Sequence, residues 1–347
     1  MKKILIVLLL LVIVLGLGVG GCGGPQEPEA KPTIVIGDNN WGSAHFLAEM
    51  QEIIIEHGYG YPVELIAGKT VILWEATIAG DVDVDPEVWR PNMADWDKAI
   101  SGGELIDLAI INEDNWQSLF VVPTYMIEGD ASRGIDPMTP ELHSVDQLSD
   151  PKYKELFADP ENPGKGRIFN CLPGWECELI NQRQLKAYGL DEHYNLVNPG
   201  SQEALFANLI KAYENGEPYI TYLWGPTWIA GKLDLTRLEE PAYNEQDWET
   251  DNSCAYPSAD IHVVAHPSFP EKAPDVTEMY ESWYMETAYF NEALAYMDET
   301  GGEPFDAALW FLKEREEVWT KFVPDDIAEN VKEAVASGMV TPPTTAE

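Results

Sequence analysis

The sequence predicts an α/β fold of two lobes with a ligand cleft between them. Two observations support this class. Strand and helix patterns alternate from residue 33 to about residue 265, and tryptophan residues fall in the segments that follow the strands. In open parallel sheets, ligands bind beyond the carboxyl ends of the strands. We therefore expect the tryptophan-bearing segments to line the cleft.

The first 22 residues are expected to lie outside the fold. Lys2 and Lys3 precede an apolar run from Ile4 to Leu17, and small residues lead directly to Cys22. This order is typical of a lipoprotein signal peptide, with the lipid attached to Cys22. The alternative is a membrane-spanning helix, but the apolar run is shorter than the roughly 20 residues that a span needs. We predict that residues 23–32 form a flexible tether and that the protein is extracytoplasmic, lipid-anchored to the outer face of the cell membrane.

Composition limits the partners. The chain has 60 acidic against 21 basic residues, for a net charge of −39, so we expect no nucleic acid as partner. Solubility in a salty or alkaline medium is the simplest explanation; attraction of cations toward the cleft is the alternative. Cys171, Cys177 and Cys254 permit one disulfide, whose pairing stays open. No cysteine or histidine spacing predicts a metal site, and we expect no cofactor and a monomer.

The N-terminal part of the mature chain has a β-α-β-α-β pattern, which predicts a parallel sheet with right-handed crossovers. Its expected elements are a strand at 33–38, a helix from Ser43 to His57, a strand from Val63 to Ala67, a helix from Thr70 to Ala79, and a short strand after Gly80.

The rest of the chain continues in the same style and then becomes nearly all helical. The expected strands are Ile106–Ile111, Leu119–Tyr125, Arg167–Cys171, Tyr219–Trp224 and Ile261–Ala265. The expected helices are Glu178–Tyr188, Gln202–Glu214, Asp275–Met285, Thr287–Glu299, Pro304–Phe322 and Asp325–Ser337.

The loop after the first strand is the first candidate for ligand contact. It contains Asn40, Trp41 and Gly42 just before a predicted helix. The free N–H groups at a helix N-terminus suit a carboxylate, and Gly42 permits close backbone approach. The alternative is an ordinary loop whose helix is capped by Ser43 or Asn40.

Four further tryptophans follow strands. Trp89, Trp175 and Trp224 come directly after strand patterns, and Trp228 follows the Gly225-Pro226 turn; we favour Trp224 over Trp228 for the site. Converging indole faces suit a quaternary ammonium cation, which donates no hydrogen bond and is held by cation–π attraction. The remaining tryptophans in helix patterns are better explained by core packing; they are Trp74, Trp96, Trp283, Trp310 and Trp319.

Four motifs in order resemble the glycine betaine/proline betaine-binding proteins of ABC importers. They are Ile-Gly37-Asp-Asn-Asn-Trp41, Ala-Gly80-Asp-Val-Asp-Val with Glu-Val-Trp89-Arg-Pro, Val-Val-Pro123-Thr-Tyr, and Tyr-Leu-Trp224-Gly-Pro-Thr-Trp with Asp234-Leu-Thr-Arg-Leu-Glu-Glu-Pro241. The resemblance implies a type II periplasmic-binding-protein fold, for which we expect residues 33–125 and 256–347 to form lobe I and residues 126–255 to form lobe II.

The resemblance also implies a site. Trp89 matches the first position of the family's aromatic cage, and Trp175 and Trp224 match later ones, with backbone amides of the first loop holding a carboxylate. Related proteins often carry a His after the Pro of the fourth motif, and this chain has none. Either Thr227 takes its part, or the ligand lacks a carboxylate, as choline does.

The expected function is therefore capture of a quaternary ammonium solute, glycine betaine or proline betaine, and its delivery to an ABC permease; choline, carnitine or another solute is the alternative. An enzyme is not expected. A secreted glycoside hydrolase would need paired carboxylates. Asp85, Glu87 and Glu176 are examples of the many available, but no spacing singles out a pair.

Overall fold

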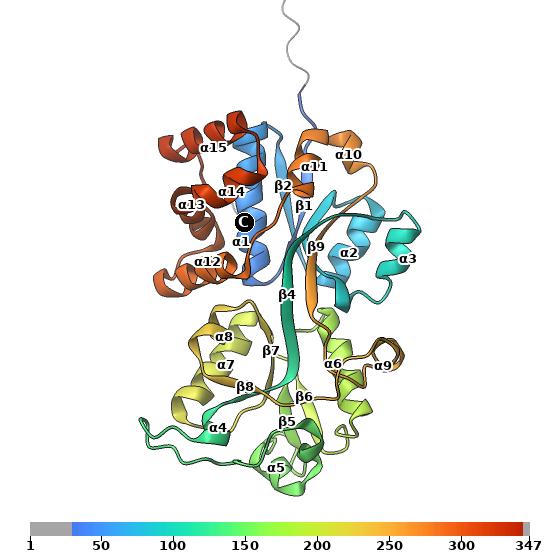
Figure 1. Cartoon of the computed structure of the whole chain (residues 1–347), viewed down its shortest axis with the longest axis vertical. Helices are drawn as coiled ribbons and strands as arrows, with labels where there is room; N and C mark the ends of the chain where they lie inside the picture. The colour runs from blue at the N-terminus through green and yellow to red at the C-terminus, as the bar shows by residue number, and fades with distance from the viewer. Residues whose placement is uncertain (1–29, 343–347) are drawn as a thin grey trace, which may run out of the picture. The chain divides into compact units, whose positions relative to one another are not determined.

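The computed structural model describes residues 30–342 (Figure 1). The predicted leader, the predicted lipidation site Cys22 and most of the predicted tether lie outside these residues. All helices and strands described below belong to one compact unit, Pro32–Glu347. Within the described residues, no helix combines the length and the apolar character needed to cross a membrane.

Nine strands of the described chain form one mixed sheet. Its order is β2-β1-β3-β9-β4-β7-β5-β6, with β8 pairing with β4. The strands are β1 Ile34–Asn39, β2 Val63–Gly68, β3 Val84–Trp89, β4 Ile106–Pro123, β5 Gly166–Phe169, β6 Tyr194–Val197, β7 Thr221–Gly225, β8 Leu235–Arg237 and β9 Ala259–Ala265. The predicted parallel start is confirmed, because β1 pairs in parallel with both β2 and β3.

The expectation of two strands at Ile106–Ile111 and Leu119–Tyr125 is wrong, because both belong to the 18-residue strand β4. The residues between them, 112–118, are mostly polar. In the structure the buried side-chain N–H groups of Asn112 and Asn115 donate to the backbone oxygens of Met285 and Ala259, so segments far away in the sequence satisfy these donors within the strand. β4 pairs with β9 as far as Asn115 and with β7 from Trp116.

The long strand β4 therefore passes through two groups of elements (Figure 1). With β1–β3 and β9 lie the helices α1 Gly42–Ile53, α2 Thr70–Ala79, α3 Trp96–Ser101, α10 Phe269–Lys272, α11 Pro274–Glu281, α12 Thr287–Thr300, α13 Pro304–Glu314, α14 Glu316–Trp319 and α15 Asp325–Ser337. With β5–β8 lie α4 Tyr125–Glu128, α5 Pro151–Leu156, α6 Glu176–Ala187, α7 Gln202–Asn215, α8 Trp228–Lys232 and α9 Glu245–Thr250. The lobe boundaries 125/126 and 255/256 remain predictions.

Most predicted helices are present. The apolar spacing that predicted α1 is real: Phe46, Leu47 and Met50 are fully buried, and a π-helical turn, Ile54–Tyr59, extends the helix. The single helix expected at Pro304–Phe322 is wrong, since the chain leaves helical geometry at Arg315. The guanidinium of Arg315 bonds to Glu292 of α12, and α14 begins in a new direction.

Candidate functional site

A small hollow lies where the start of α1, the end of β3, the start of α6 and strand β7 meet. We call it the Trp cavity. Its lining residues are Trp41, Thr70, Trp89, Asn92, Gln117, Trp175, Glu176, Cys177, Tyr222 and Trp224. Four of the five tryptophans predicted for the site are therefore brought together from four separate segments of the chain.

Three of the tryptophan rings of this cavity contact one another edge to face. Trp175 is central: its ring centroid lies 5.5 Å from that of Trp41 and 5.3 Å from that of Trp224, with interplanar angles of 79° and 84°. Tyr222 stacks on Trp224 at 5.7 Å. Trp41, Trp175 and Trp224 therefore form one connected aromatic cluster that lines the hollow.

A buried carboxyl group, that of Glu87, holds two of the walls. Its Oε1 accepts hydrogen bonds from Nε1 of Trp41 at 2.6 Å, from the hydroxyl of Ser43 at 2.8 Å and from Nε1 of Trp89 at 3.4 Å. Burial raises the pKa of Glu87 to about 7, against the lowering effect of these donors. When ionised, Glu87 places a negative charge behind the rings, which favours a cation in front of them.

Sequence reasoning missed this role of Glu87. A usable signal was present, because residues i and i+2 of a strand lie on the same face, which puts Glu87 beside Trp89. Asp85, two residues earlier, is also buried, accepts a hydrogen bond from Asn39 at 2.9 Å, and has its pKa raised to about 7 by burial.

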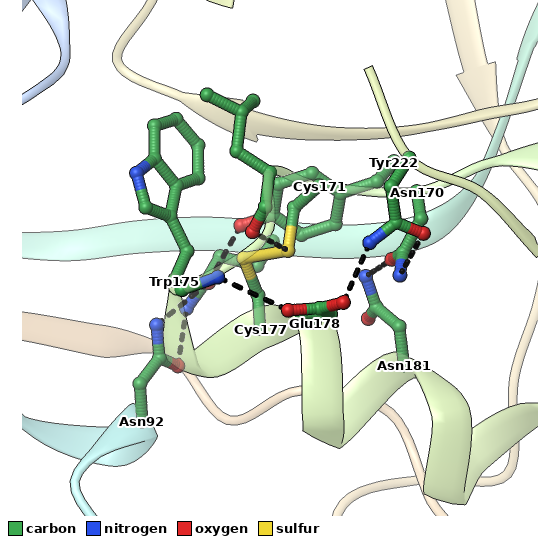
Figure 2. The surroundings of a disulfide bond; sticks show 12 residues. Asn92, Asn170, Cys171, Trp175, Cys177, Glu178, Asn181 and Tyr222 are labelled. Carbon is green, nitrogen blue, oxygen red and sulfur yellow. Dashed lines mark hydrogen bonds between the residues drawn. A yellow bond between two sulfur atoms is a disulfide. The ribbon is translucent and has the colours of Figure 1, made fainter. Parts of the chain in front are cut away.

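The third wall, Trp175, is carried by a short loop closed by a disulfide. Cys171 and Cys177 are bonded, which settles the pairing left open by the sequence, and Cys254 is a buried free thiol. Figure 2 shows this disulfide at the start of α6, with Trp175 in the loop that it closes. The backbone N–H of Gly174 donates to Glu178 at 3.0 Å and further ties the loop to α6.

The polar part of the lining consists of amides, hydroxyls and one carboxyl group. Asn92 and Gln117 exchange two hydrogen bonds of 3.0 Å, and the hydroxyl of Tyr222 donates to Gln117 at 2.8 Å. Glu176 supplies the carboxyl group, and burial raises its pKa above the ordinary value. None of the described lining residues is a Lys, Arg or His.

The other predicted site residues, Asn40, Gly42 and Thr227, are not among the lining residues of the Trp cavity; Gly42 and Thr227 line a smaller hollow beside it, and the polar groups of all three are engaged. Oδ1 of Asn40 accepts from Nε1 of Trp175 at 2.7 Å, and the N–H of Gly42 donates to Oε1 of Gln202 at 3.2 Å. Thr227 caps α8 and donates its hydroxyl hydrogen to the backbone oxygen of Trp224. Neither Asn40 nor Ser43 caps α1 with its side chain.

Trp228 is placed away from the Trp cavity. It lines a smaller hollow together with Trp41, Trp224 and Phe206, and its own ring packs edge to face on Phe206 at 5.7 Å. Trp224 lines both hollows, and the preference for Trp224 over Trp228 as a ligand contact stays a prediction. Of the tryptophans expected in the core, Trp74, Trp96, Trp283 and Trp319 are buried, and Trp310 is half-buried and stacks on Tyr296.

Comparisons with known proteins agree with this geometry. The family described as the substrate-binding domain of ABC-type glycine betaine transport systems matches residues 32–314. A trimethylamine N-oxide-binding protein of Pelagibacter ubique is 26% identical over 85% of this chain and 91% of its own length. A glycine betaine/proline betaine-binding periplasmic protein of Escherichia coli is 30% identical, but the match covers 46% of this chain and about half (51%) of that relative.

The fold is also that of solved structures. A glycine betaine/L-proline-binding protein of Borrelia burgdorferi superposes with a TM-score of 0.69 over 86% of this chain and 99% of that one, at 20% identity. This likeness confirms the predicted two-lobe α/β class.

Proposed function

This chain belongs to the family of substrate-binding domains of ABC-type glycine betaine transport systems, and from this premise we propose that it captures one small methylated-ammonium solute in the Trp cavity. The predicted family and the predicted role in ABC import are confirmed by the match. The family is one of solute-binding transport proteins and not an enzyme family, so the solute is expected to leave chemically unchanged.

The observation that carries the proposal is the convergence of Trp41, Trp89, Trp175 and Trp224 on one hollow with the buried carboxyl group of Glu87 behind two of them. A methylated nitrogen has no N–H group to donate, so faces of rings serve it better than hydrogen-bond acceptors do. Each desolvated cation–π contact contributes about 0.5–2 kcal/mol. Three or four such contacts with added hydrogen bonds reach the roughly −8 kcal/mol of micromolar affinity.

We infer that the two lobes close around the solute, and contacts that join the two groups of elements support this. Asn40 bonds to Trp175, Gly42 bonds to Gln202, and Lys232 of α8 pairs with Asp298 of α12 at 2.7 Å. In our proposal these contacts are absent while the cleft is open and form when the solute is enclosed. The closed form is then the one that the permease of the importer receives.

The cellular setting is part of the same proposal. The leader pattern supports export and lipid attachment at Cys22, with a monomeric binding protein held on the outer face of the membrane. Mass spectrometry of the protein purified from membranes tests this: a chain that begins at a diacylated Cys22 is expected, and an intact leader would contradict it.

Calorimetric titration tests the binding proposal. The panel is glycine betaine, proline betaine, choline, carnitine and trimethylamine N-oxide, and we expect at least one of them to bind with micromolar affinity. Trp175→Leu is expected to weaken that affinity at least tenfold, whereas Trp310→Leu, which removes an indole outside the cavity, is the matched control. Absence of binding by all five solutes at millimolar concentration would overturn the proposed function.

A further inference from the structure

The described lining of the Trp cavity carries an acidic side chain and no basic one. Glu176, the first residue of α6, is the one carboxyl-bearing side chain in the described lining, and the lining contains no cationic side chain. The side chain of Glu176 is half-buried and accepts no hydrogen bond from the described residues. The charged groups that influence it are Arg183, on the same helix, and Asp95.

The donors that would hold a solute carboxylate in the first loop are already in use. The N–H of Asn40 donates to the backbone oxygen of Gly68, that of Trp41 to Asn39, and that of Gly42 to Gln202. The start of α1 also faces an acid of the protein itself, because Ser43 donates to Glu87. The hydroxyl of Thr227 is bonded to the backbone oxygen of Trp224.

Two helix starts among the described lining residues still offer unbonded N–H groups: that of α2, with Thr70, and, directly after Trp175, that of α6. The first N–H groups of a helix have no partner within the helix, and Glu176 and Cys177 both line the cavity there. A solute carboxylate at this position would lie beside the carboxyl group of Glu176. Two carboxylates at close range repel each other, and partial burial reduces the screening of that repulsion.

We propose that Glu176 makes the Trp cavity selective for methylated-ammonium solutes without a carboxylate, such as choline and trimethylamine N-oxide, over glycine betaine and proline betaine. This inference rests on the proposed function and decides between the two alternatives that the missing His left open. The hydroxyl of choline accepts from the N–H groups of α6 and donates to Glu176. The oxygen of an N-oxide accepts from the same N–H groups and from Glu176 in its protonated form.

Lys69 is a basic residue near the cavity that would favour the opposite selectivity, for solutes with a carboxylate. Its side chain lies against Gly174 at the cavity rim, where a Cβ added to Gly174 would stand 2.6 Å from Lys69 Cδ. A lysine that turned inward when the solute binds would attract a solute carboxylate. Lys69 is outside the lining residues, although its neighbour Thr70 is among them, so we assign the selectivity to Glu176.

The test is calorimetric titration of the whole protein and three variants with choline, trimethylamine N-oxide, glycine betaine and proline betaine. We expect the unmodified protein to bind choline or the N-oxide at least tenfold more tightly than either betaine. In Glu176→Gln this ratio is expected to fall at least tenfold, through weaker choline binding and unchanged or tighter betaine binding. Glu75→Gln removes the same charge from an exposed residue of α2 and is expected to change nothing.

The outcomes are distinguishable. If no solute binds, the proposed function fails. If glycine betaine binds as tightly as choline and the N-oxide, or if Glu176→Gln changes all affinities equally, the proposed function stands and the role of Glu176 is refuted. Loss of betaine binding in Lys69→Gln would likewise refute it, because a cation would then hold the carboxylate.

The pH dependence separates the two preferred solutes. Choline needs Glu176 ionised, so its affinity rises with pH, whereas the N-oxide shares a proton with Glu176, so its affinity falls with pH. Glu87 also titrates near the cavity. For each solute we therefore compare the pH dependence of affinity in the unmodified protein with that in Glu176→Gln, and we assign only the difference to Glu176. Equal slopes in the protein and the variant for both solutes would contradict the direct contact with Glu176.

Discussion

Replacement of Glu87 by Gln tests whether the negative charge of Glu87 strengthens the binding of a cationic solute. Burial raises the pKa of Glu87 from 4.5 to about 7, which corresponds to about 3 kcal/mol against its ionised form in the free protein. A cation in front of the rings, at about 7 Å and an effective dielectric constant of about 20, recovers roughly 2 kcal/mol of this. The nearly isosteric Glu87→Gln variant keeps an acceptor for Trp41 but loses the charge. We therefore expect up to about 30-fold weaker binding near pH 8 and little change near pH 5, where Glu87 is protonated.

The Glu87→Gln change also removes a pH-dependent contribution to the free energy of unfolding. A carboxyl group whose pKa is raised in the folded state stabilises that state fully below about pH 4.5, and this contribution is lost as the pH rises through about 7. The free energy of unfolding of Glu87→Gln should therefore fall less across this range than that of the unmodified protein. Glu240→Gln is the matched control, because burial also raises the pKa of Glu240 to about 7, but its partners Ser118 and Tyr188 lie outside the cavity lining.

Urea unfolding and calorimetric titration from about pH 5 to about pH 9 supply both readouts. Glu240→Gln should reproduce the flatter stability profile with unchanged affinity at every pH. The electrostatic reasoning is refuted if Glu87→Gln lowers affinity by the same factor at both ends of the range, since that pattern indicates a purely structural role for Glu87.

Three further changes address the walls and the closure of the cavity. Trp89→Leu is expected to weaken binding at least tenfold through loss of one cation–π contact, and unchanged affinity in titration would make Trp89 structural. The double change Cys171→Ser and Cys177→Ser opens the loop that carries Trp175; we expect about 2 kcal/mol lower stability in urea and weaker binding, and equal affinity would show that the loop is held by other contacts. Lys232→Met removes an exposed ion pair across the cleft and should weaken binding by less than about fivefold, with the deficit shrinking at high salt; a larger, salt-independent loss would contradict a screened contact.

Much of the fold was predictable from local patterns. The predicted helices Thr70–Ala79 and Asp325–Ser337 match α2 and α15 residue for residue. The error at β4 arose because Asn112 and Asn115 look like turn residues along the chain, and their hydrogen-bond partners, Met285 and Ala259, are far away in sequence. Partners of this kind are fixed by tertiary packing and leave no local signal.

The sequence predicted the aromatic residues of the site better than its charged and polar residues. Position at or shortly after the end of a strand pattern selected Trp89, Trp175 and Trp224; in the structure Trp89 ends β3, Trp224 lies near the end of β7, and Trp175 lies between β5 and α6. Glu87 is one of 60 acidic residues, and its hydrogen bonds to Trp41, Ser43 and Trp89, which set it apart, appear only in the structure. Thr227 looked available for a ligand until the structure placed its hydroxyl in the cap of α8.

The direct test of a cation held by indole faces is a comparison of choline with its uncharged carbon isostere, in which a quaternary carbon replaces the nitrogen. Both fill the same space, and only one carries the positive charge. We predict that titration calorimetry will find choline bound at least tenfold more tightly, the minimum for several contacts of about 0.5 kcal/mol or more each. Equal affinities for the two compounds would contradict the account, because shape and apolar burial alone would then explain the site.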